Sequence, residues 1–570
     1  MRYLAQQAEA LLFQLSHIGG MGTWADSELF GHADVTTVQA LLESASSFAG
    51  EFLVPLATSG DREGCHLHDG RVSLPSGSVD VFRQWVELGF PALGLPQSID
   101  GLGLPSAVQS AVQELCDGAN LSMGMLFINL RCAALALLKS ATADQQQRWL
   151  PGIMAGTLAT TIAISEPQAG SDVGRIRTQA APQPDGSFRL SGSKIWISYA
   201  DHDATGDILH LALARLPDGE TGSRGLSLFA APKLLDGKHN GVEVLRLEHK
   251  MGLHASPTCV LEFTNARAEL IGEPGKGLAA LFVMMNAMRL AVAVQGSAVA
   301  NATTLQALAY AAERPQGGHP LSPPVNIIEH VDVQRMLLEM TAESELMRAL
   351  SLRIAAMLDK AEQMSTRGDT EATQWQRLAE LILPVAKTYN AETAFTVANT
   401  GIQVMGGYGY TSDYPIERMA RDIRVAAIYE GTSGIQALDF VKRKVAGDQG
   451  VVLQQLLTMI DSSLTNGTSP FVTAWPEVRS AVQIALARAL TMSKQQSRTV
   501  EGGAYASLQL TALALHCWNG HALYTAADDA SEHGARLRAA LQYFAASVTA
   551  KAALWSARAA AEIPDFSYVK

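Results

Sequence analysis

The sequence PDGSFRLSGSKIWIS at residues 184–198 differs in its pattern of apolar and polar residues from the long helical stretches on either side of it. A Pro-Asp-Gly turn signal is followed by short apolar runs that Gly and Ser interrupt, a pattern typical of β-strands. Similar short runs follow at residues 208–214, 226–231 and 259–263. Short strands at this spacing predict a compact β-barrel or sandwich, and we place this domain at residues 159–272.

The chain on both sides of this region has the pattern of helices. Residues 107–115 are rich in Ala and Val with polar residues at helical spacing. A helical pattern of apolar residues begins again near Lys276. Turn-rich breaks lie at 314–326 and 447–450. We predict an α+β chain of four domains, because the sheet is segregated between helical blocks and does not alternate with helices. The predicted helical domains are residues 1–158, 273–446 and 447–570.

The composition excludes several classes of protein. The chain has 570 residues, of which 48% are hydrophobic and 17% charged, so it can bury several cores and is not expected to be disordered. Its formal net charge of -12 argues against nucleic acid as the main partner. The five Cys residues form no CxxC pair, which argues against a disulfide framework or a metal site and favours a reducing compartment.

No targeting or membrane segment is expected. The N-terminus lacks the basic-then-apolar order of a signal peptide. The most apolar stretch, residues 278–300, contains Asn286, Arg289 and Gln295, so we interpret it as a buried helix and not as a membrane span. These features predict a soluble, cytoplasmic protein.

Two strings in the strand region are candidate ligand-binding segments. ISEPQAGSD at residues 164–172 is either an ordinary loop or a loop whose backbone N–H groups and Ser hydroxyls face a polar ligand. Its small residues Ala169 and Gly170 allow close approach of the main chain. Trp196 lies between two Ile residues of a predicted strand, so it should point to the opposite face from them. There it could cover a planar ring, although a packed aromatic residue has the same spacing.

A third string contains a candidate base. QVMGGYG at residues 403–409 is followed by Tyr-Glu-Gly-Thr at 429–432. Glu430 therefore stands beside a glycine, where a carboxylate can approach a substrate with little steric hindrance. In an apolar cleft its pKa would rise, and it could serve as a base near neutral pH. The alternative is a solvated loop carboxylate.

Taken in order, the three strings resemble the acyl-CoA dehydrogenase family over residues 85–445. The region after residue 445, with the strings at 248–253 and 428–438, resembles the longer branch of that family. The resemblance implies an N-terminal helical domain, a middle β-barrel, a four-helix bundle and an extra C-terminal helical domain. It also implies that FAD lies between barrel and bundle and is shared with a neighbouring subunit, in a homodimer or homotetramer.

The resemblance assigns roles to individual residues. It makes Glu430 the catalytic base, and Met288, where some relatives carry a base, cannot take a proton. The residues implied in FAD binding are Ile164, Ser165, Gly170, Ser171, Trp196, Ile197, Ser198, Arg314, Gln403, Gly406, Gly407 and Thr432. The residues implied in substrate binding are Ser171, Arg289 and Gly431. The chain departs from the family at residues 314–317, where Arg-Pro-Gln-Gly replaces Arg-x-x-Phe-Gly and puts part of the flavin contact in doubt.

The implied activity is the α,β-dehydrogenation of an acyl-CoA to the trans-2-enoyl-CoA. Glu430 would take the α-proton and flavin N5 the β-hydride, and an electron-transfer flavoprotein would accept the electrons. The acyl group could be 3-methylthiopropionyl or a short to long fatty chain. Alternatives are an acyl-CoA oxidase, a dehydrogenase of carrier-protein-bound chains, and a DNA-binding flavoprotein. The last is disfavoured by residues 446–570, where nine Lys and Arg balance nine Asp and Glu.

Overall fold

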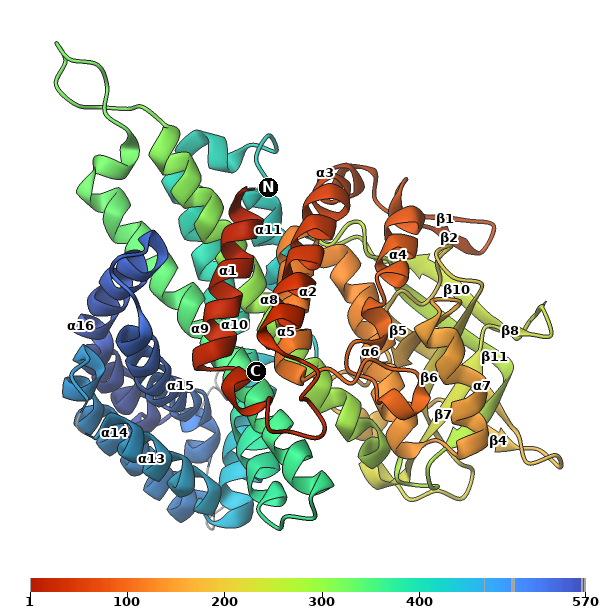
Figure 1. The fold of residues 1–570 in the computed structure, drawn as a ribbon. Helices are drawn as coiled ribbons and strands as arrows, with labels where there is room; N and C mark the ends of the chain where they lie inside the picture. The colour runs from red at the N-terminus through yellow and green to blue at the C-terminus, as the bar shows by residue number, and fades with distance from the viewer. Residues whose placement is uncertain (1, 466, 494–497, 565–566, 568–570) are drawn as a thin grey trace. The chain divides into compact units, whose positions relative to one another are not determined.

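The computed structural model of the chain describes residues 2–465, 467–493, 498–564 and 567 (Figure 1). The chain forms two compact units. The barrel unit comprises Ser47–Leu104 and Ala119–Met288, and the helical unit comprises Met1–Ser46, Pro105–Gly118 and Arg289–Lys570. The 37-residue helix α8 (Gly277–Glu313) begins in the barrel unit and continues into the helical unit.

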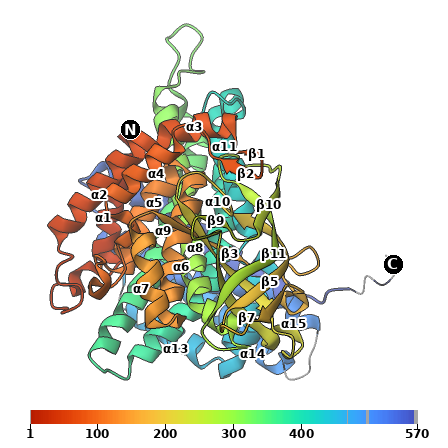
Figure 2. The same cartoon turned by 90° about the vertical axis from the view of Figure 1, so that its right-hand side faces the viewer.

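The barrel unit contains a seven-stranded sheet (Figure 2). Its strands are β3 (Leu158–Ala163), β4 (Gln179–Pro182), β5 (Phe188–Ser198), β6 (Asp207–Arg215), β7 (Leu226–Pro232), β10 (Val242–Leu247) and β11 (Thr258–Ile271). They lie in the order β10-β11-β5-β4-β6-β3, and β7 pairs with both β11 and β6, so the sheet closes on itself. Most neighbours run antiparallel, and β3 runs parallel to β6. The predicted barrel is confirmed.

Apolar side chains from these strands fill the barrel. Leu190, Phe229 and Phe263 are buried in one hydrophobic cluster, and each such side chain stabilises the fold by about 1.5–3 kcal/mol relative to an exposed one. The helices of this unit are α3 (Val54–Glu63), α4 (Ser78–Glu87), α6 (Leu121–Ser140) and α7 (Ala143–Met154). Two small hairpins pair β1 (His66–His68) with β2 (Arg71–Ser73), and β8 (Leu234–Leu235) with β9 (Lys238–His239).

A buried ion pair attaches the loop after β3 to strand β5. Lys194 Nζ lies 2.8 Å from Glu166 Oε1 and donates to the carbonyl of Ile164 at 3.0 Å. Glu166 also accepts from the backbone N–H and the hydroxyl of Thr178. Burial alone would raise the pKa of Glu166, but the charge of Lys194 and these hydrogen bonds lower it to about 2. The pair therefore stays charged at neutral pH and holds the loop at residues 164–172 in place.

The helical unit is built on the long helices α8, α9 and α10. Its helices are α1 (Arg2–His17), α2 (Val35–Phe48), α5 (Ser106–Ala119), α9 (Val331–Thr366), α10 (Ala372–Met405), α11 (Ile416–Ile423), α12 (Ser433–Leu438), α13 (Val451–Leu464), α14 (Pro470–Ser493), α15 (Arg498–Ala526) and α16 (Glu532–Ala560). Helices α14, α15 and α16 pack on one another, α16 packs on α9, and α15 packs on α10 and α12 (Figure 1). The expected extra C-terminal helices therefore share a core with the bundle.

A buried charge network joins four of these helices. Arg348 of α9 lies 2.7 Å from Glu114 of α5 and 2.9 Å from Glu345 of its own helix. Gln14 of α1 donates to Glu345 at 2.6 Å, and His533 of α16 lies 3.2 Å from the same carboxylate. Burial alone would raise the pKa of Glu345, but Arg348 and the hydrogen bonds lower it to about 2. Because these residues are far apart in the sequence, the network fixes how the helices align.

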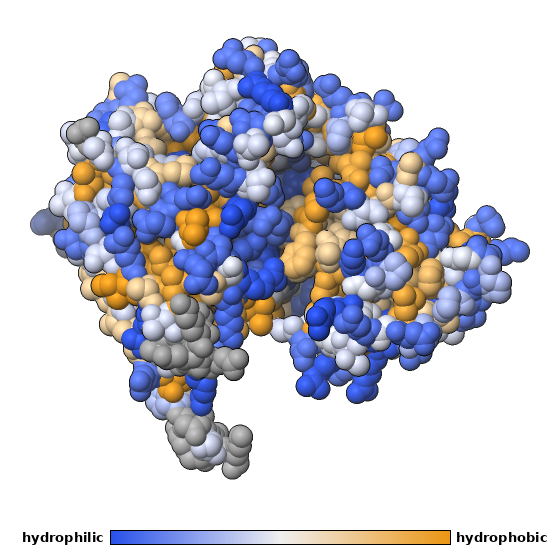
Figure 3. Space-filling model, turned by 90° about the horizontal axis from the view of Figure 1, so that it is seen from below, coloured by the Kyte–Doolittle hydropathy of each residue, from blue (hydrophilic) through white to orange (hydrophobic). Residues whose placement is uncertain are grey.

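Two helices among the described residues are long and apolar enough to cross a membrane. They are α6 and α8, and 83% and 56% of their most apolar windows are buried inside the protein. Such burial is what core helices of a globular fold show, and it agrees with the interpretation of residues 278–300 as a buried helix. Figure 3 shows a face of the molecule on which polar residues are interspersed with apolar ones.

Replacing Lys194 with Met is expected to lower the free energy of unfolding by about 3–5 kcal/mol, because Glu166 is left buried without its counter-ion. Urea unfolding measures the loss. The matched control is Arg175→Ala, which breaks the exposed ion pair of Arg175 with Asp172 in the same loop region. It should cost less than about 1 kcal/mol. Equal losses in the two variants would contradict this account.

Replacing Arg348 with Met should destabilise the helical unit by about 3–5 kcal/mol at neutral pH. The lowered pKa of Glu345 adds stability above its unfolded value of about 4.3, and this stability is lost as the pH falls toward about 2. We therefore expect wild-type stability to fall across that range and Arg348→Met to show a flatter pH dependence there. Urea unfolding at a series of pH values tests this, and equally steep curves for both proteins would be the contrary result.

Candidate active site

Glu430 lies in a tight turn of the helical unit. The turn connects the 3-10 helix Arg424–Ala427 to α12. Glu430 has φ of 52° and Gly431 has φ of 88°, so two consecutive residues adopt the left-handed conformation. A Cβ at position 431 would lie 2.8 Å from Gln436 Nε2, so the second position requires glycine. The glycine beside the carboxylate is therefore needed for the shape of this turn.

Three side chains fix the turn by binding its backbone. Gln436 Nε2 donates to the carbonyl of Glu430 at 2.8 Å, and Lys387 Nζ donates to the carbonyl of Gly431 at 2.7 Å. The Thr432 hydroxyl accepts from the N–H of Ile435 at 3.3 Å and caps α12. The first two bonds satisfy carbonyls that no regular helix or sheet pairs, and the third satisfies an N–H at the start of α12. Together the three bonds fix the backbone from which the Glu430 side chain extends.

The environment of Glu430 raises the pKa of its carboxyl. Removal from water is the main cause, and the positive charges of Lys387 and Arg289 oppose it. Arg289 is buried, and its Nη1 lies 2.8 Å from Asp439 Oδ2. A carboxyl with a raised pKa is a stronger base than an exposed one, which is the property that proton abstraction near neutral pH needs.

The neighbouring groups leave the N–H of Glu430 available. Tyr429 lies next to Glu430 in the chain and its hydroxyl donates to Gln295 Oε1. Burial raises the pKa of Tyr429 well above its usual range, so it stays neutral. Among the described residues, no group accepts a hydrogen bond from the N–H of Glu430. This donor is free to bind an oxygen of a ligand.

The predicted flavin residues of the barrel unit lie on adjoining segments. Trp196 is 59% exposed, whereas Ile197 is buried. The exposure arises at a β-bulge, because the pairing of β5 with β11 shifts by one residue between Lys194 and Ile197 and Trp196 has φ of 62°. The alternation of side chains along a strand therefore predicts correctly that Trp196 is exposed. It does not predict the β-bulge that causes this exposure. Ser198 is the last residue of β5.

The 164–172 loop runs beside this strand. The carbonyl of Ser165 accepts from the N–H of Ile195 at 2.9 Å, which places the loop next to the exposed indole of Trp196. Gly170 and Ser171 are exposed. A Cβ built on Gly170 meets no atom within 4 Å, so the main chain there is open to a ligand.

A second group of predicted flavin residues lies where α8 and α10 end. The Arg314 guanidinium lies over the ring of Tyr408, 5.2 Å from its centroid. Gln403 is in the last turn of α10 and is exposed. Gly406 and Gly407 follow it, and a Cβ on either would meet no atom within 4 Å. The segment therefore offers a cation, an amide and open backbone on one surface.

These groups have the chemistry that FAD requires of its site. An exposed indole suits the flat isoalloxazine ring, open glycines allow the main chain to approach, and a guanidinium suits a diphosphate. The predicted residues therefore fit the cofactor. Within the helical unit, Glu430, Gly431, Thr432 and Arg289 lie in one neighbourhood.

Two residues of the site were not predicted from the sequence. Lys387 holds the Gly431 carbonyl, and Gln436 holds the Glu430 carbonyl. Lys387 is the only charged residue in the run LILPVAKTYNA at residues 381–391. A lone charge in an apolar helical stretch is a signal that could have identified it. Gln436 carries no comparable signal.

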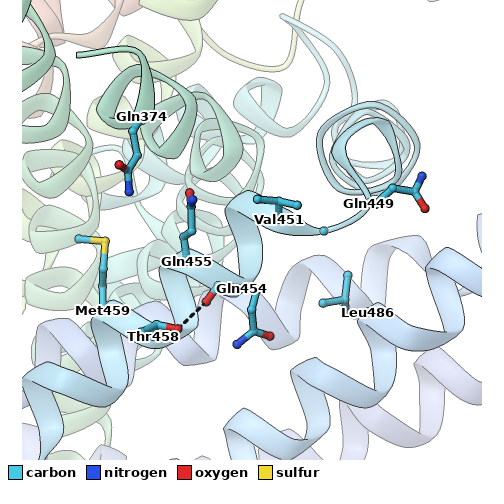
Figure 4. Close-up of a pocket in the computed structure, with 9 residues that line it drawn as sticks. Gln374, Gln449, Val451, Gln454, Gln455, Thr458, Met459 and Leu486 are labelled. Carbon is cyan, nitrogen blue, oxygen red and sulfur yellow. Dashed lines mark hydrogen bonds between the residues drawn. The ribbon is translucent and has the colours of Figure 1, made fainter. Parts of the chain in front are cut away.

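A surface hollow of about 610 Å³ lies elsewhere in the helical unit (Figure 4). Gln374 of α10, Gln454 and Thr458 of α13 and Leu486 of α14 contribute to its lining. Figure 4 shows Thr458 bonded to the backbone of Gln454, and their distance is 3.0 Å. None of the lining residues is ionisable or among the predicted site residues. The hollow therefore has no part in the candidate chemistry.

Comparison with known proteins identifies the family of the chain. Three family models match the chain: the acyl-CoA dehydrogenase N-terminal domain at residues 36–157, the middle domain at 161–266 and the C-terminal domain at 275–445. The chain is 37% identical over 517 residues to 3-methylmercaptopropionyl-CoA dehydrogenase of Ruegeria pomeroyi, covering 88% of this chain and 87% of that protein.

Two further proteins resemble the chain. It is 33% identical to the broad-specificity linear acyl-CoA dehydrogenase FadE5 of Mycobacterium tuberculosis, over 80% of this chain and 78% of that protein. An acyl-CoA dehydrogenase from Bacillus anthracis, solved in complex with FAD, shares the fold with a TM-score of 0.75 at 20% identity, over 94% of this chain and 90% of that one. The family and the fold predicted from the sequence are confirmed: the chain belongs to the acyl-CoA dehydrogenase family of FAD-dependent oxidoreductases.

Proposed function

We propose that this chain removes the α-proton and the β-hydride of an acyl-CoA thioester, with Glu430 as the base, and releases the trans-2-enoyl-CoA. The observation that carries the proposal is the carboxyl of Glu430, fixed in a left-handed turn and shifted to a higher pKa by burial. FAD, when bound, supplies the acceptor for the hydride. Glu430 supplies the acceptor for the proton.

The α C–H of a thioester is a weak acid, so its carbonyl oxygen must be polarised as the proton leaves. The N–H of Glu430 has no acceptor among the described residues and is the donor we assign to that oxygen. One such preorganised donor contributes about 3 kcal/mol to the stabilisation of the transition state. Base and donor then belong to the same residue, and the turn that fixes one fixes the other.

The cofactor would be held by both groups of residues described above. Ser165, Trp196 and Ser198 would contact the flavin from the barrel, with Ile164, Gly170, Ser171 and Ile197 beside them. Arg314, Gln403, Gly406 and Gly407 would contact FAD of a neighbouring subunit in a homodimer or homotetramer. Thr432 would contact FAD, and Ser171, Arg289 and Gly431 the acyl-CoA. Arg289 is buried against Asp439, which favours an electrostatic role for it near the thioester.

The relatives suggest the substrate class. One of them acts on 3-methylmercaptopropionyl-CoA and another on linear acyl-CoAs. We propose a short thioether or linear acyl-CoA as the substrate, an electron-transfer flavoprotein as the electron acceptor, and a cytoplasmic location. An oxidase or a dehydrogenase of carrier-bound chains would share the same base.

Glu430→Gln should lose at least about 100-fold in the anaerobic rate of flavin bleaching by substrate, because general base catalysis contributes this much or more. The FAD content should be unchanged. Stopped-flow absorbance of the FAD-loaded protein measures both. The matched control is Glu380→Gln, which removes a carboxylate of α10 that is ion-paired to Lys444. Bleaching by Glu430→Gln at the wild-type rate would exclude Glu430 as the base.

Anaerobic titration with a panel of acyl-CoAs should bleach the flavin in the wild type. The panel includes 3-methylthiopropionyl-CoA and straight chains of increasing length, and the best substrate should lie among the short or linear members. Oxygen uptake in air, measured with an electrode, should be slow compared with reduction of an electron-transfer flavoprotein. Rapid stoichiometric oxygen uptake would instead identify an oxidase.

A further inference from the structure

Lys387 is a buried lysine with an unusual set of partners. It lies in the middle of α10 with no exposed surface, and its Nζ donates to the carbonyl of Gly431 at 2.7 Å. Among the described residues it forms no ion pair with a carboxylate. A buried ammonium without a paired anion is costly, so a lysine kept at such a position requires an explanation.

The charges around Lys387 come from several elements. Glu392 lies further along α10, Glu430 is in the turn, and Arg289 approaches from α8. Burial lowers the pKa of Lys387 to about 8, the two carboxylates oppose this shift, and Arg289 adds to it. Lys387 therefore remains mostly protonated near neutral pH.

The two cations near Glu430 differ in how far they are neutralised. Arg289 is ion-paired to Asp439 at 2.8 Å, and Arg443 lies 3.0 Å from the same carboxylate. Tyr429, which faces Asp117 of α5 and Glu430, is neutral. Arg289 thus shares one carboxylate with a second cation, whereas Lys387, among the described residues, has no ion pair at all.

We propose that Lys387 is a positioning residue for the catalytic base: its ammonium holds the carbonyl of Gly431, which fixes the turn, and its charge favours the ionised form of Glu430, which is the form that accepts the α-proton. The inference rests on the proposed function of Glu430. Burial alone would favour a protonated and inactive carboxyl, and Lys387 offsets that tendency at a distance too long for an ion pair. Among the described residues, no partner binds the Glu430 carboxylate directly, so the base keeps its strength.

Two variants separate the charge of Lys387 from its hydrogen bond. Lys387→Met removes both, whereas the amide of Lys387→Gln is neutral and retains a donor for the Gly431 carbonyl. Infrared titration of the FAD-loaded protein follows the C=O stretch of the protonated Glu430 carboxyl, which is identified as the band missing from Glu430→Gln. We expect the midpoint to move to higher pH by about one pH unit in both variants, because each loses one nearby opposite charge.

The kinetics provide a second readout. The acid limb of the pH profile for anaerobic flavin reduction should move upward with the infrared midpoint. At a pH above that limb, Lys387→Gln should keep a higher maximal rate of reduction than Lys387→Met, because the turn stays bound. The apparent Kd for acyl-CoA should change less than this rate in both variants.

Lys444→Met is the control, since it removes a lysine of the same unit that is ion-paired to Glu380. It should leave the Glu430 midpoint unchanged. An unchanged or lowered midpoint in the Lys387 variants, or an equal shift in Lys444→Met, would overturn the proposal. If Lys387→Met does not fold, the shift of the midpoint in Lys387→Gln alone tests the proposal. A wild type that no acyl-CoA reduces would contradict the proposed function, while the infrared titration would still measure the effect of Lys387 on Glu430.

Discussion

The hydrogen bond between Lys387 Nζ and the carbonyl of Gly431 connects the fold to the chemistry. Two consecutive left-handed residues leave backbone carbonyls that neither a helix nor a sheet can pair. Lys387 of α10 and Gln436 of α12 satisfy two of these carbonyls, which fixes the backbone of the turn at Glu430. The backbone position of Glu430, the proposed base, therefore depends on a side chain of α10.

Each unit contains a buried carboxylate site that is paired with a cation. In the barrel unit Glu166 is paired with Lys194, and in the helical unit Arg348 lies between two carboxylates. Each of these buried acids is directly paired, and the pKa of Glu166 is lowered as a result. Glu430 has no such partner, and its pKa is raised instead. The carboxylates of these two ion-paired sites and the proposed catalytic carboxylate thus differ in whether a cation contacts them.

Much of the fold was predictable from the sequence, because strand and helix periodicities differ and turn signals separate them. The barrel, the flanking helices and the exposure of Trp196 follow from such local patterns. Lys387 could not be placed in the same way, because the turn that it binds lies 44 residues later in the chain. The β-bulge at Trp196 could not be predicted from the sequence either, because the register of β5 depends on its partner strand β11. The proposed roles of Glu430 and the flavin residues were inferred from the order of the family motifs along the chain. The spacing of the residues alone did not distinguish these roles from purely structural ones.

The C-terminal helices share polar as well as apolar contacts with the bundle. His533 of α16 lies 3.2 Å from Glu345, and Tyr505 of α15 donates to Glu392 of α10. A chain shortened to residue 446 would leave the Glu345 network without one donor and would expose the faces of α9 and α10 that α15 and α16 cover. We therefore expect the region after residue 446 to unfold together with the bundle. A protease cut near residue 447 should yield two fragments that stay associated, and gene truncation there should yield an insoluble product.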